Sequence, residues 1–271
     1  MFTTKSAHLP ARITRTAAFF DLDKTIIATN SAYAYGKELL NSGLISPATA
    51  LEMYLAKTSY MFSGHSSEQM DASRDQLAAM ITGWDVQQLT TLIEKTMHDV
   101  VCPAIYEEAR TLIGSHLASG HDVVIVSASA REIVEPIAKE LGVKQVVATD
   151  FEKKDGKFTG TILFYCKGAA KSEAIHELAQ RNNYDLAQCF AYSDSMTDLP
   201  MLQTVGKPIA VNPDRSLRKY ATENGWEIKV FRNPVPLIPM PSGKEIGIST
   251  GVLALVAALT LGGSWIIKRY R

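Results

Sequence analysis

Short apolar runs rich in β-branched and aromatic residues recur along the chain, separated by turn residues and by segments with helical periodicity. Apolar runs of this kind predict strands that are buried on both faces. The intervening segments place apolar residues three or four positions apart, which is the period of an amphipathic helix. The predicted strands are residues 17–20, 123–127, 145–149, 189–193, 208–212 and 228–231, and the predicted helices are 131–141, 172–182 and 215–224.

The alternation of strand and helix predicts the fold class. A strand, a helix and a second strand in this order form the right-handed crossover unit of a parallel sheet. We therefore expect an α/β fold, with a doubly wound, Rossmann-like parallel sheet built from residues 1–28 and 118–231. Residues 151–164 depart from the alternation, because Lys154-Asp155-Gly156-Lys157 is typical of a hairpin turn and predicts an antiparallel pair at the sheet edge.

The long stretch from residue 29 to residue 117 has helical periodicity and lacks a convincing strand. Because this stretch begins just after the first strand, we expect a helical cap that is inserted over the carboxyl edge of the sheet. A cap of this kind can exclude water and select substrates. Its predicted helices are residues 32–40, 47–61, 67–80 and 86–101.

The last part of the chain has a different pattern. Residues 246–267 contain no charged residue, and Lys268-Arg269-Tyr270-Arg271 follows them. A bilayer core takes about 20 apolar residues. A buried C-terminal helix is the alternative, but such a helix usually carries a polar stripe, which this segment lacks. We therefore predict a C-terminal transmembrane helix, preceded by residues 232–245 as an extended, proline-rich linker.

The two ends of the chain bear on localisation. Residues 1–16 lack the apolar core of a secretory signal. We therefore expect a membrane protein with a single-pass C-terminal anchor and with its catalytic domain, if it has one, in the cytoplasm. The basic end by itself favours the cytoplasm, but a tail of four residues is easily translocated.

The composition is that of an ordinary globular protein and excludes several classes of function. With 46% hydrophobic and 21% charged residues, the 271-residue chain can form one or two domains. The 28 basic and 28 acidic residues balance, so no overall field favours nucleic acid. Cys102, Cys166 and Cys189 lack the spacing of a zinc site. The six histidines form no ligand pair, so we expect surface or capping roles for them.

Two carboxylates, Asp21 and Asp23, follow the first predicted strand. If the chain curls just beyond that strand, both lie at the carboxyl edge of the sheet, where open α/β folds bind ligands. Paired carboxylates at such an edge suit a nucleophile with its own acid/base. Taken alone, Asp-x-Asp is equally typical of an acidic loop after a strand.

Two more strand ends carry polar residues. Ser127 ends the second predicted strand, where its hydroxyl and the amides of the next helix can hold a phosphate. A helix cap is the alternative role, and it suits Ser129 as well. Asp194 and Asp198 follow the fourth predicted strand, and Asp194 lies where a hard cation needs a carboxylate.

A lysine marks the start of one predicted helix. Lys171 lies in its first turn, where a positive charge opposes the helix dipole, so its presence indicates an anionic partner. Lys167, four residues earlier, competes for this role, and the spacing alone leaves the choice open.

These four elements, in this order and each at the end of a strand or the start of a helix, resemble the motifs of the haloacid dehalogenase superfamily over residues 17–231. The helical insertion and the run Asp194-Ser195-Met196-Thr197-Asp198-Leu199-Pro200-Met201-Leu202 resemble its phosphoserine-phosphatase-like branch, subfamily IB, with a type-one helical cap. The resemblance implies a Mg²⁺-dependent phosphatase that forms an aspartyl phosphate.

The resemblance also implies a role for each matching residue. Asp21 is the nucleophile, Asp23 the general acid/base, and Lys171 the residue that neutralises phosphate charge. The remaining residues form two sets: the phosphate contacts Thr25, Ser127 and Ala128, and the Mg²⁺ ligands Asp21, Asp23 through its backbone carbonyl, and Asp194, with Asp198 in the outer shell.

One position departs from that branch. Phosphoserine phosphatases carry a glutamate nine residues after the nucleophile, which receives the substrate ammonium, whereas this chain has Asn30. We therefore expect a phosphomonoester substrate at the membrane, such as a lipid headgroup. The alternatives are a phosphoserine phosphatase of serine biosynthesis and a non-catalytic, membrane-tethered binding module.

Overall fold

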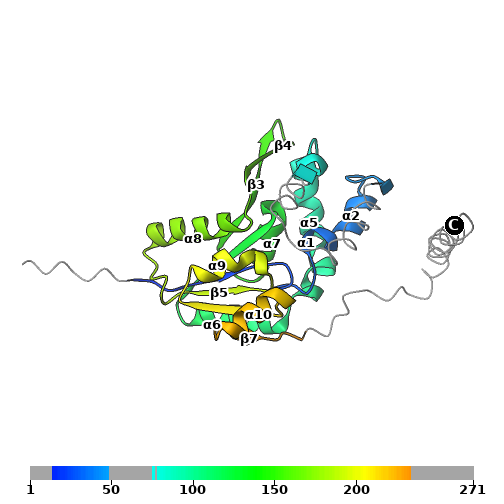
Figure 1. Ribbon diagram of the computed structural model, residues 1–271. Helices are drawn as coiled ribbons and strands as arrows, with labels where there is room; N and C mark the ends of the chain where they lie inside the picture. Colours follow the sequence, from blue (N-terminus) through cyan, green and yellow to red (C-terminus); the bar gives the residue numbers. More distant parts are fainter. Residues whose placement is uncertain (1–13, 49–74, 77, 233–271) are drawn as a thin grey trace, which may run out of the picture. The chain divides into compact units, whose positions relative to one another are not determined.

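The computed structural model describes residues 14–48, 75–76 and 78–232, which Figure 1 draws as a ribbon. The predicted linker beyond residue 232 and the predicted transmembrane helix 246–267 lie outside the described residues, as do parts of two predicted cap helices. None of the helices in the described ranges combines the length and the hydropathy that crossing a membrane requires.

A seven-stranded sheet forms the centre of the protein, with the strand order β4-β3-β2-β1-β5-β6-β7. Strand β1 (Ala17–Phe20) lies in the middle and pairs in parallel with β2 (Asp122–Ala130) and β5 (Phe190–Ser193). Among the strand pairs, β3 with β4 is the antiparallel one. The predicted doubly wound, Rossmann-like α/β sheet is therefore confirmed. The other strands are β3 (Gln145–Lys154), β4 (Lys157–Phe164), β6 (Lys207–Val211) and β7 (Glu227–Lys229).

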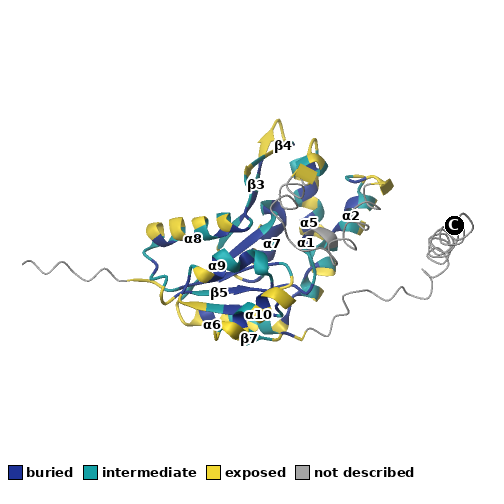
Figure 2. Cartoon of the chain, viewed as in Figure 1, coloured by how far each residue is buried: buried dark blue, intermediate teal, exposed yellow. Residues whose placement is uncertain are grey.

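Helices cover both faces of the sheet because alternate strand residues point to opposite sides. In β1, Phe20 joins one apolar cluster and Phe19 joins the other. All residues of β1 are buried, and Figure 2 shows the same for much of the central sheet. The first cluster includes residues of α6 (Glu107–Ala118) and α7 (Arg131–Glu140), and the second includes residues of α8 (Ala169–Asn182), α9 (Leu199–Gln203) and α10 (Arg215–Glu223).

Most of the described residues between β1 and β2 are helical. All of helix α6 except its last residue lies inside the range 29–117 that we assigned to the cap, but the helix contacts β2 and covers the sheet. We use the term insertion for the helical elements that precede α6. They are α1 (Ser31–Ala34), α2 (Gly36–Asn41), α5 (Val86–Val100) and a short 3₁₀ turn, η1 (Cys102–Ala104).

The chain enters and leaves the insertion through two segments that bond to each other. Ala28 N donates to Ala104 O at 2.8 Å, and Tyr106 N donates to Ile26 O at 2.9 Å. We call this pair of segments, residues 26–28 and 104–106, the stem. It joins the insertion to the end of β1 on one side and to the start of α6 on the other.

A second attachment links the insertion to the β3–β4 hairpin, which turns at the Lys154–Lys157 pair as expected from the sequence. Gly83 N donates to Phe158 O at 2.8 Å, and Phe158 N donates to Trp84 O at 3.0 Å. We call these backbone bonds the hairpin joint. The edge hairpin therefore holds the segment that leads into α5.

One histidine is buried beneath the sheet, so the surface or capping role expected from the sequence is wrong for it. His116 of α6 is 6% exposed, and its Nε2 lies 2.8 Å from the hydroxyl of Tyr192. Its Nδ1 lies 2.9 Å from Nδ1 of His121, and its ring packs edge-on against Phe20. Burial first, and then the nearby His121 and Lys207, lowers the pKa of His116 to about 4.

We expect acid to destabilise the fold partly through His116. Its folded-state pKa lies below the ordinary 6.5, so the stabilisation present above pH 6.5 is lost as the pH falls toward 4. This difference in pKa corresponds to about 3 kcal/mol. Over that pH range, the unfolding free energy should fall more steeply for the wild-type protein than for His116→Gln. Denaturant titrations of both proteins measure the slopes, and equal slopes would contradict the assignment.

Candidate active site

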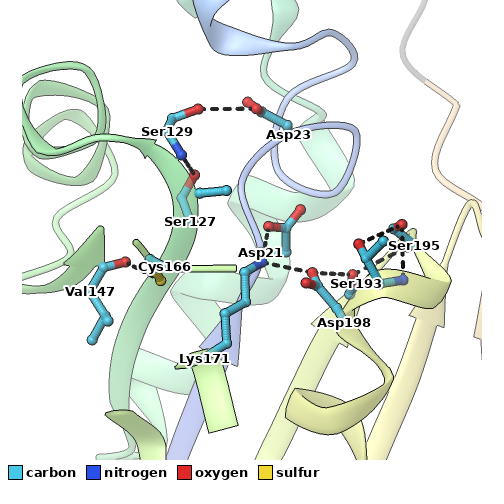
Figure 3. A network of polar contacts seen from close by, with 12 residues as sticks. Asp21, Asp23, Ser127, Ser129, Val147, Cys166, Lys171, Ser193, Ser195 and Asp198 are labelled. Carbon is cyan, nitrogen blue, oxygen red and sulfur yellow. Dashed lines mark hydrogen bonds and ion pairs between the residues drawn. The ribbon is translucent and has the colours of Figure 1, made fainter. Parts of the chain in front are cut away.

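The chain turns where β1 ends, and this turn presents two carboxyl groups. Asp21 N donates to Tyr192 O at 2.9 Å, which extends the pairing with β5 beyond the end of the strand. Lys24 then adopts a positive φ of 62°, which is uncommon outside turns. Figure 3 shows Asp21 and Asp23 on this turn, at the carboxyl end of the strand. The curl expected from the sequence is therefore present.

A buried lysine joins two acids. Lys171, in the first turn of α8, is 2% exposed, and its Nζ donates to Asp21 Oδ1 and to Asp198 Oδ2, each at 2.7 Å. The hydroxyl of Ser193, at the end of β5, also donates to Asp198 Oδ2 at 2.7 Å. Figure 3 shows the amine of Lys171 between the two carboxylates. Of the two lysines that the sequence left open, Lys171 is therefore the one that bonds to Asp21.

Burial and the neighbouring charges shift the pKa values of Lys171, Asp21 and Asp194. Burial would lower the pKa of Lys171, but Asp198 and Asp21 outweigh burial and raise it above its ordinary value. Burial raises the pKa of Asp21; Lys171 opposes this rise, while Asp198 and Asp23 add to it. Burial and then Asp21 raise the pKa of Asp194 well above its ordinary value. A cation that binds at this edge would lower the pKa values of these acids.

The same acids suit a hard divalent cation. Asp21 and Asp194 are 7% and 8% exposed, and Asp194 is fixed through its backbone because Asp214 N donates to Asp194 O at 2.7 Å. Carboxylate and carbonyl oxygens are the ligands that Mg²⁺ prefers. The residues present therefore fit Mg²⁺, which Asp21, Asp194 and the backbone carbonyl of Asp23 would hold. Asp198, which bonds to Lys171, would remain outside this ligand set.

Three donors fix the side chain of Asp23. Ser31 N donates to Oδ1 at 2.8 Å, and the Asn30 amide and the Ser129 hydroxyl donate to Oδ2 at 3.0 Å and 3.1 Å. Burial raises the pKa of Asp23, and the bonds from Ser31 and Ser129 oppose that rise. A positioned carboxyl group with a raised pKa suits proton transfer. Ser129 thus bonds to Asp23, and the N-cap of α7 is Ala130.

The residues that the sequence assigned to phosphate lie after β1 and at the end of β2. The hydroxyl of Thr25 is buried and has no hydrogen-bond partner within the described residues. The hydroxyl of Ser127 accepts from Ser129 N at 3.1 Å. Ala128 O accepts from the Thr149 hydroxyl at 2.7 Å, which fixes the end of β2. Because a buried, unpaired hydroxyl costs free energy, Thr25 is suited to bond to a ligand oxygen.

Sequence reasoning missed the residues that act through contacts between distant segments. Ser31 and Ser129 hold Asp23, Thr149 holds the end of β2, and Asp214 holds the backbone of Asp194. An aspartate just before a helix is a typical N-cap, so the sequence could have revealed that Asp214 caps α10, but this pattern does not indicate its contact with Asp194. The hydroxyl residues have no local pattern that would have revealed their partners.

The chain is similar to proteins of one hydrolase family. The family model of haloacid dehalogenase-like hydrolases matches residues 18–203. A probable phosphatase of Mycobacterium tuberculosis is 47% identical over 248 residues, which cover 90% of this chain and 86% of that protein. A phosphoserine phosphatase of the same species is 35% identical over 246 residues, which cover 89% and 80%. A solved structure of a Bordetella pertussis protein with unknown function is 29% identical, with a TM-score of 0.70 over 80% of this chain and 99% of that one.

Removing the buried amine should destabilise the protein. Lys171→Met leaves Asp21 and Asp198 buried without their counter-charge, and the expected loss is about 3 to 5 kcal/mol of unfolding free energy. The loss should shrink at lower pH, because burial raises the pKa of Asp21 and this acid then binds a proton. Lys167→Met is the matched control and should cost much less. Denaturant unfolding measures both variants, and similar losses in the two would show that the assignment to Lys171 is wrong.

Proposed function

Because the chain belongs to the haloacid dehalogenase-like hydrolases, we propose that it is a phosphatase that hydrolyses phosphomonoesters through an aspartyl phosphate on Asp21. The observation that carries this proposal is the 2.7 Å salt bridge between Lys171 and Asp21 at the carboxyl end of the central strand. The contact favours the ionised form of Asp21, which is the nucleophilic form, and it places a positive charge where a phosphate would bind. Asp23 lies on the same turn with both of its oxygens held.

Asp21 would supply the nucleophile. A carboxylate can attack a phosphate dianion only when the repulsion between their negative charges is offset. Lys171 provides one positive charge, and the buried hydroxyl of Thr25 is available to a phosphate oxygen. Mg²⁺ held by Asp21, Asp194 and the carbonyl of Asp23 would add Lewis-acid stabilisation of the phosphoryl group.

Asp23 would act as the general acid in the first half-reaction and as the general base in the second. Its carboxylic acid gives a proton to the leaving alcohol oxygen as the phosphoryl group passes to Asp21. Its carboxylate then takes a proton from the water that hydrolyses the aspartyl phosphate, which regenerates Asp21 and releases phosphate. Asn30 and Ser31 bond to different oxygens of this carboxyl group, so its orientation is kept throughout.

Replacing the two acids separately tests this division of roles. Asp21→Asn removes the nucleophile, so we expect neither turnover nor phosphoenzyme. Asp23→Asn should still form a phosphoenzyme from an activated aryl phosphate, but its hydrolysis should slow by about 10²- to 10⁴-fold because no base activates the water. Phosphate released by hydroxylamine from acid-quenched enzyme measures the intermediate.

In the same assay, excess EDTA should stop the wild-type enzyme and Mg²⁺ should restore it. Appreciable turnover by Asp21→Asn would contradict the proposed mechanism. Full turnover in EDTA would contradict the proposed metal dependence alone.

We further propose that the enzyme acts at the cytoplasmic face of a membrane. Support comes from residues 246–267, which are uncharged and long enough to span a bilayer core. The compact unit that contains the sheet ends at Asn233, so the proline-rich residues 232–245 would connect the two parts. A short stalk of this kind would keep the active site near the lipid headgroups.

A membrane lipid that carries a phosphomonoester is the substrate class that this arrangement favours. The amide of Asn30 donates to Asp23, so this position offers no carboxylate to receive a substrate ammonium. An ammonium without a partner costs a few kcal/mol, which is enough to slow turnover about a hundredfold. Free phosphoserine is the second candidate, and the 35% identical relative that is named a phosphoserine phosphatase favours it.

One experiment separates these two substrates. Full-length protein in vesicles should hydrolyse a lysophosphatidate-type or phosphatidylglycerophosphate-type lipid about a hundredfold faster than phosphoserine. A chain that ends at Arg232 should keep its activity on a soluble aryl phosphate but lose most of its activity on the vesicle lipid.

Efficient hydrolysis of phosphoserine with none of either lipid would establish the second candidate. Equal activity of the shortened and full-length chains on the vesicle lipid would contradict the proposed anchor. Phosphate release measures every reaction on the same scale.

A further inference from the structure

A second group of potential metal ligands lies apart from the acids of the active site. His98 is in the last turn of α5, Cys102 begins η1, and Glu140 ends α7. One ligand atom from each of these residues lies within 4.8 Å of the other two. His98 is exposed and the other two side chains are partly exposed, so an ion can reach them from solvent.

The distance between two of these ligand atoms matches a zinc site. Nδ1 of His98 lies 3.5 Å from Sγ of Cys102. Zinc binds imidazole nitrogen at about 2.0–2.1 Å and thiolate sulfur at about 2.3 Å, so a tetrahedral angle separates the two atoms by about 3.5 Å. His98 lies in the last turn of α5 and Cys102 lies just beyond its end, so the turn into η1 brings the two ligand atoms together.

Glu140 is positioned to complete the set. Its Oε1 pairs with Arg110 NH1 of α6 at 3.3 Å. A carboxylate can bind a metal through one oxygen while its other oxygen keeps an outer partner, and such partners orient metal ligands. The ion pair with Arg110 therefore holds the Glu140 carboxylate at the site and is compatible with its binding an ion.

We propose that His98, Cys102 and Glu140 bind a zinc ion, with water as the fourth ligand. A nitrogen, a sulfur and an oxygen form the kind of mixed ligand set that zinc accepts, whereas Mg²⁺ takes oxygen ligands. This mixed ligand set differs from the active-site acids Asp21 and Asp194, which offer only oxygen ligands. Binding replaces the thiol proton of Cys102 with the metal and releases that proton to solvent.

Zinc at this position joins the insertion to the body of the protein. Helix α5 belongs to the insertion, α7 packs on the sheet, and the two helices contact each other, as Figure 1 also shows. A ligand that binds the folded state stabilises it. The ion therefore strengthens the contact between α5 and α7, and it takes no part in phosphate chemistry.

Cobalt(II) is the probe for this site, because thiolate bound to cobalt absorbs in the near ultraviolet and carboxylate does not. With excess Mg²⁺ present for the acids of the active site, the full-length protein should gain this absorption on adding cobalt and lose it on adding zinc. Cys102→Ser should abolish the absorption, and His98→Gln and Glu140→Gln should weaken cobalt binding at least about tenfold. His176→Gln replaces another exposed histidine and is the matched control, with unchanged binding.

Failure of either the absorption test or the affinity test would overturn the proposal. The absorption test fails if thiolate absorption is absent in the wild-type protein or persists in Cys102→Ser. The affinity test fails if His98→Gln and His176→Gln have equal cobalt affinity. Because His98 is exposed, its replacement should leave the fold intact even if Cys102→Ser does not fold. As a second readout, zinc should raise the Tm of the wild-type protein and of His176→Gln more than that of His98→Gln.

Discussion

The buried contact of Lys171 with Asp21 and Asp198 is the constraint on which the rest of the site depends. Any of these charges would be costly to bury alone, and together they offset that cost. Lys171 is separated along the chain from Asp21 by 150 residues and from Asp198 by 27. Only the folded sheet brings them together, so the charge arrangement of the site depends on the fold.

The sheet also supplies the surroundings that make these charges effective. Strand β1 is buried over its full length between β2 and β5, and Asp21 just beyond its end is 7% exposed, so this acid is largely removed from water. Electrostatic interactions are stronger there than in water, and an unpaired acid is correspondingly costly. This explains why small donors surround the acids: Ser193 donates to Asp198, and Ser31 donates to Asp23.

Local sequence was sufficient to predict the sheet and the position of the acids. An apolar run that is buried on both faces is recognisable within a few residues, so β1 was predicted with its observed bounds and β5 to within one residue. Asp21 and Asp194 follow the ends of these strands, so their place at the carboxyl edge was predictable as well. The strands and the position of the acids at their ends could be predicted because each depends on residues that are neighbours in the chain.

Contacts between distant segments were not predictable in this way. Ser129 donates to Asp23 across 106 residues, and no pattern near either residue indicates the other. His116 is buried because α6 packs on the sheet, and its ring is held there by Tyr192, a partner that lies 76 residues away in the chain. The approach of Glu140 to Cys102 likewise depends on the packing of α7 against α5, which local periodicity does not specify. The features that the sequence did not predict are therefore contacts between residues that are far apart in the chain.

The attachments of the insertion determine which part of it can move. Helix α5 is held by the stem, by the hairpin joint and by its packing on α7, and a body held at separate places has little freedom to rotate. A Cβ on Gly160 would collide with the Thr82 side chain, so the hairpin and the segment that leads into α5 are closely packed there. Of the described residues of the insertion, those that lead from the stem into α1 include the ones that bond to Asp23. Because Ser31 begins α1 and its backbone N–H also donates to Asp23, a movement of α1 would change the orientation of the Asp23 carboxyl group.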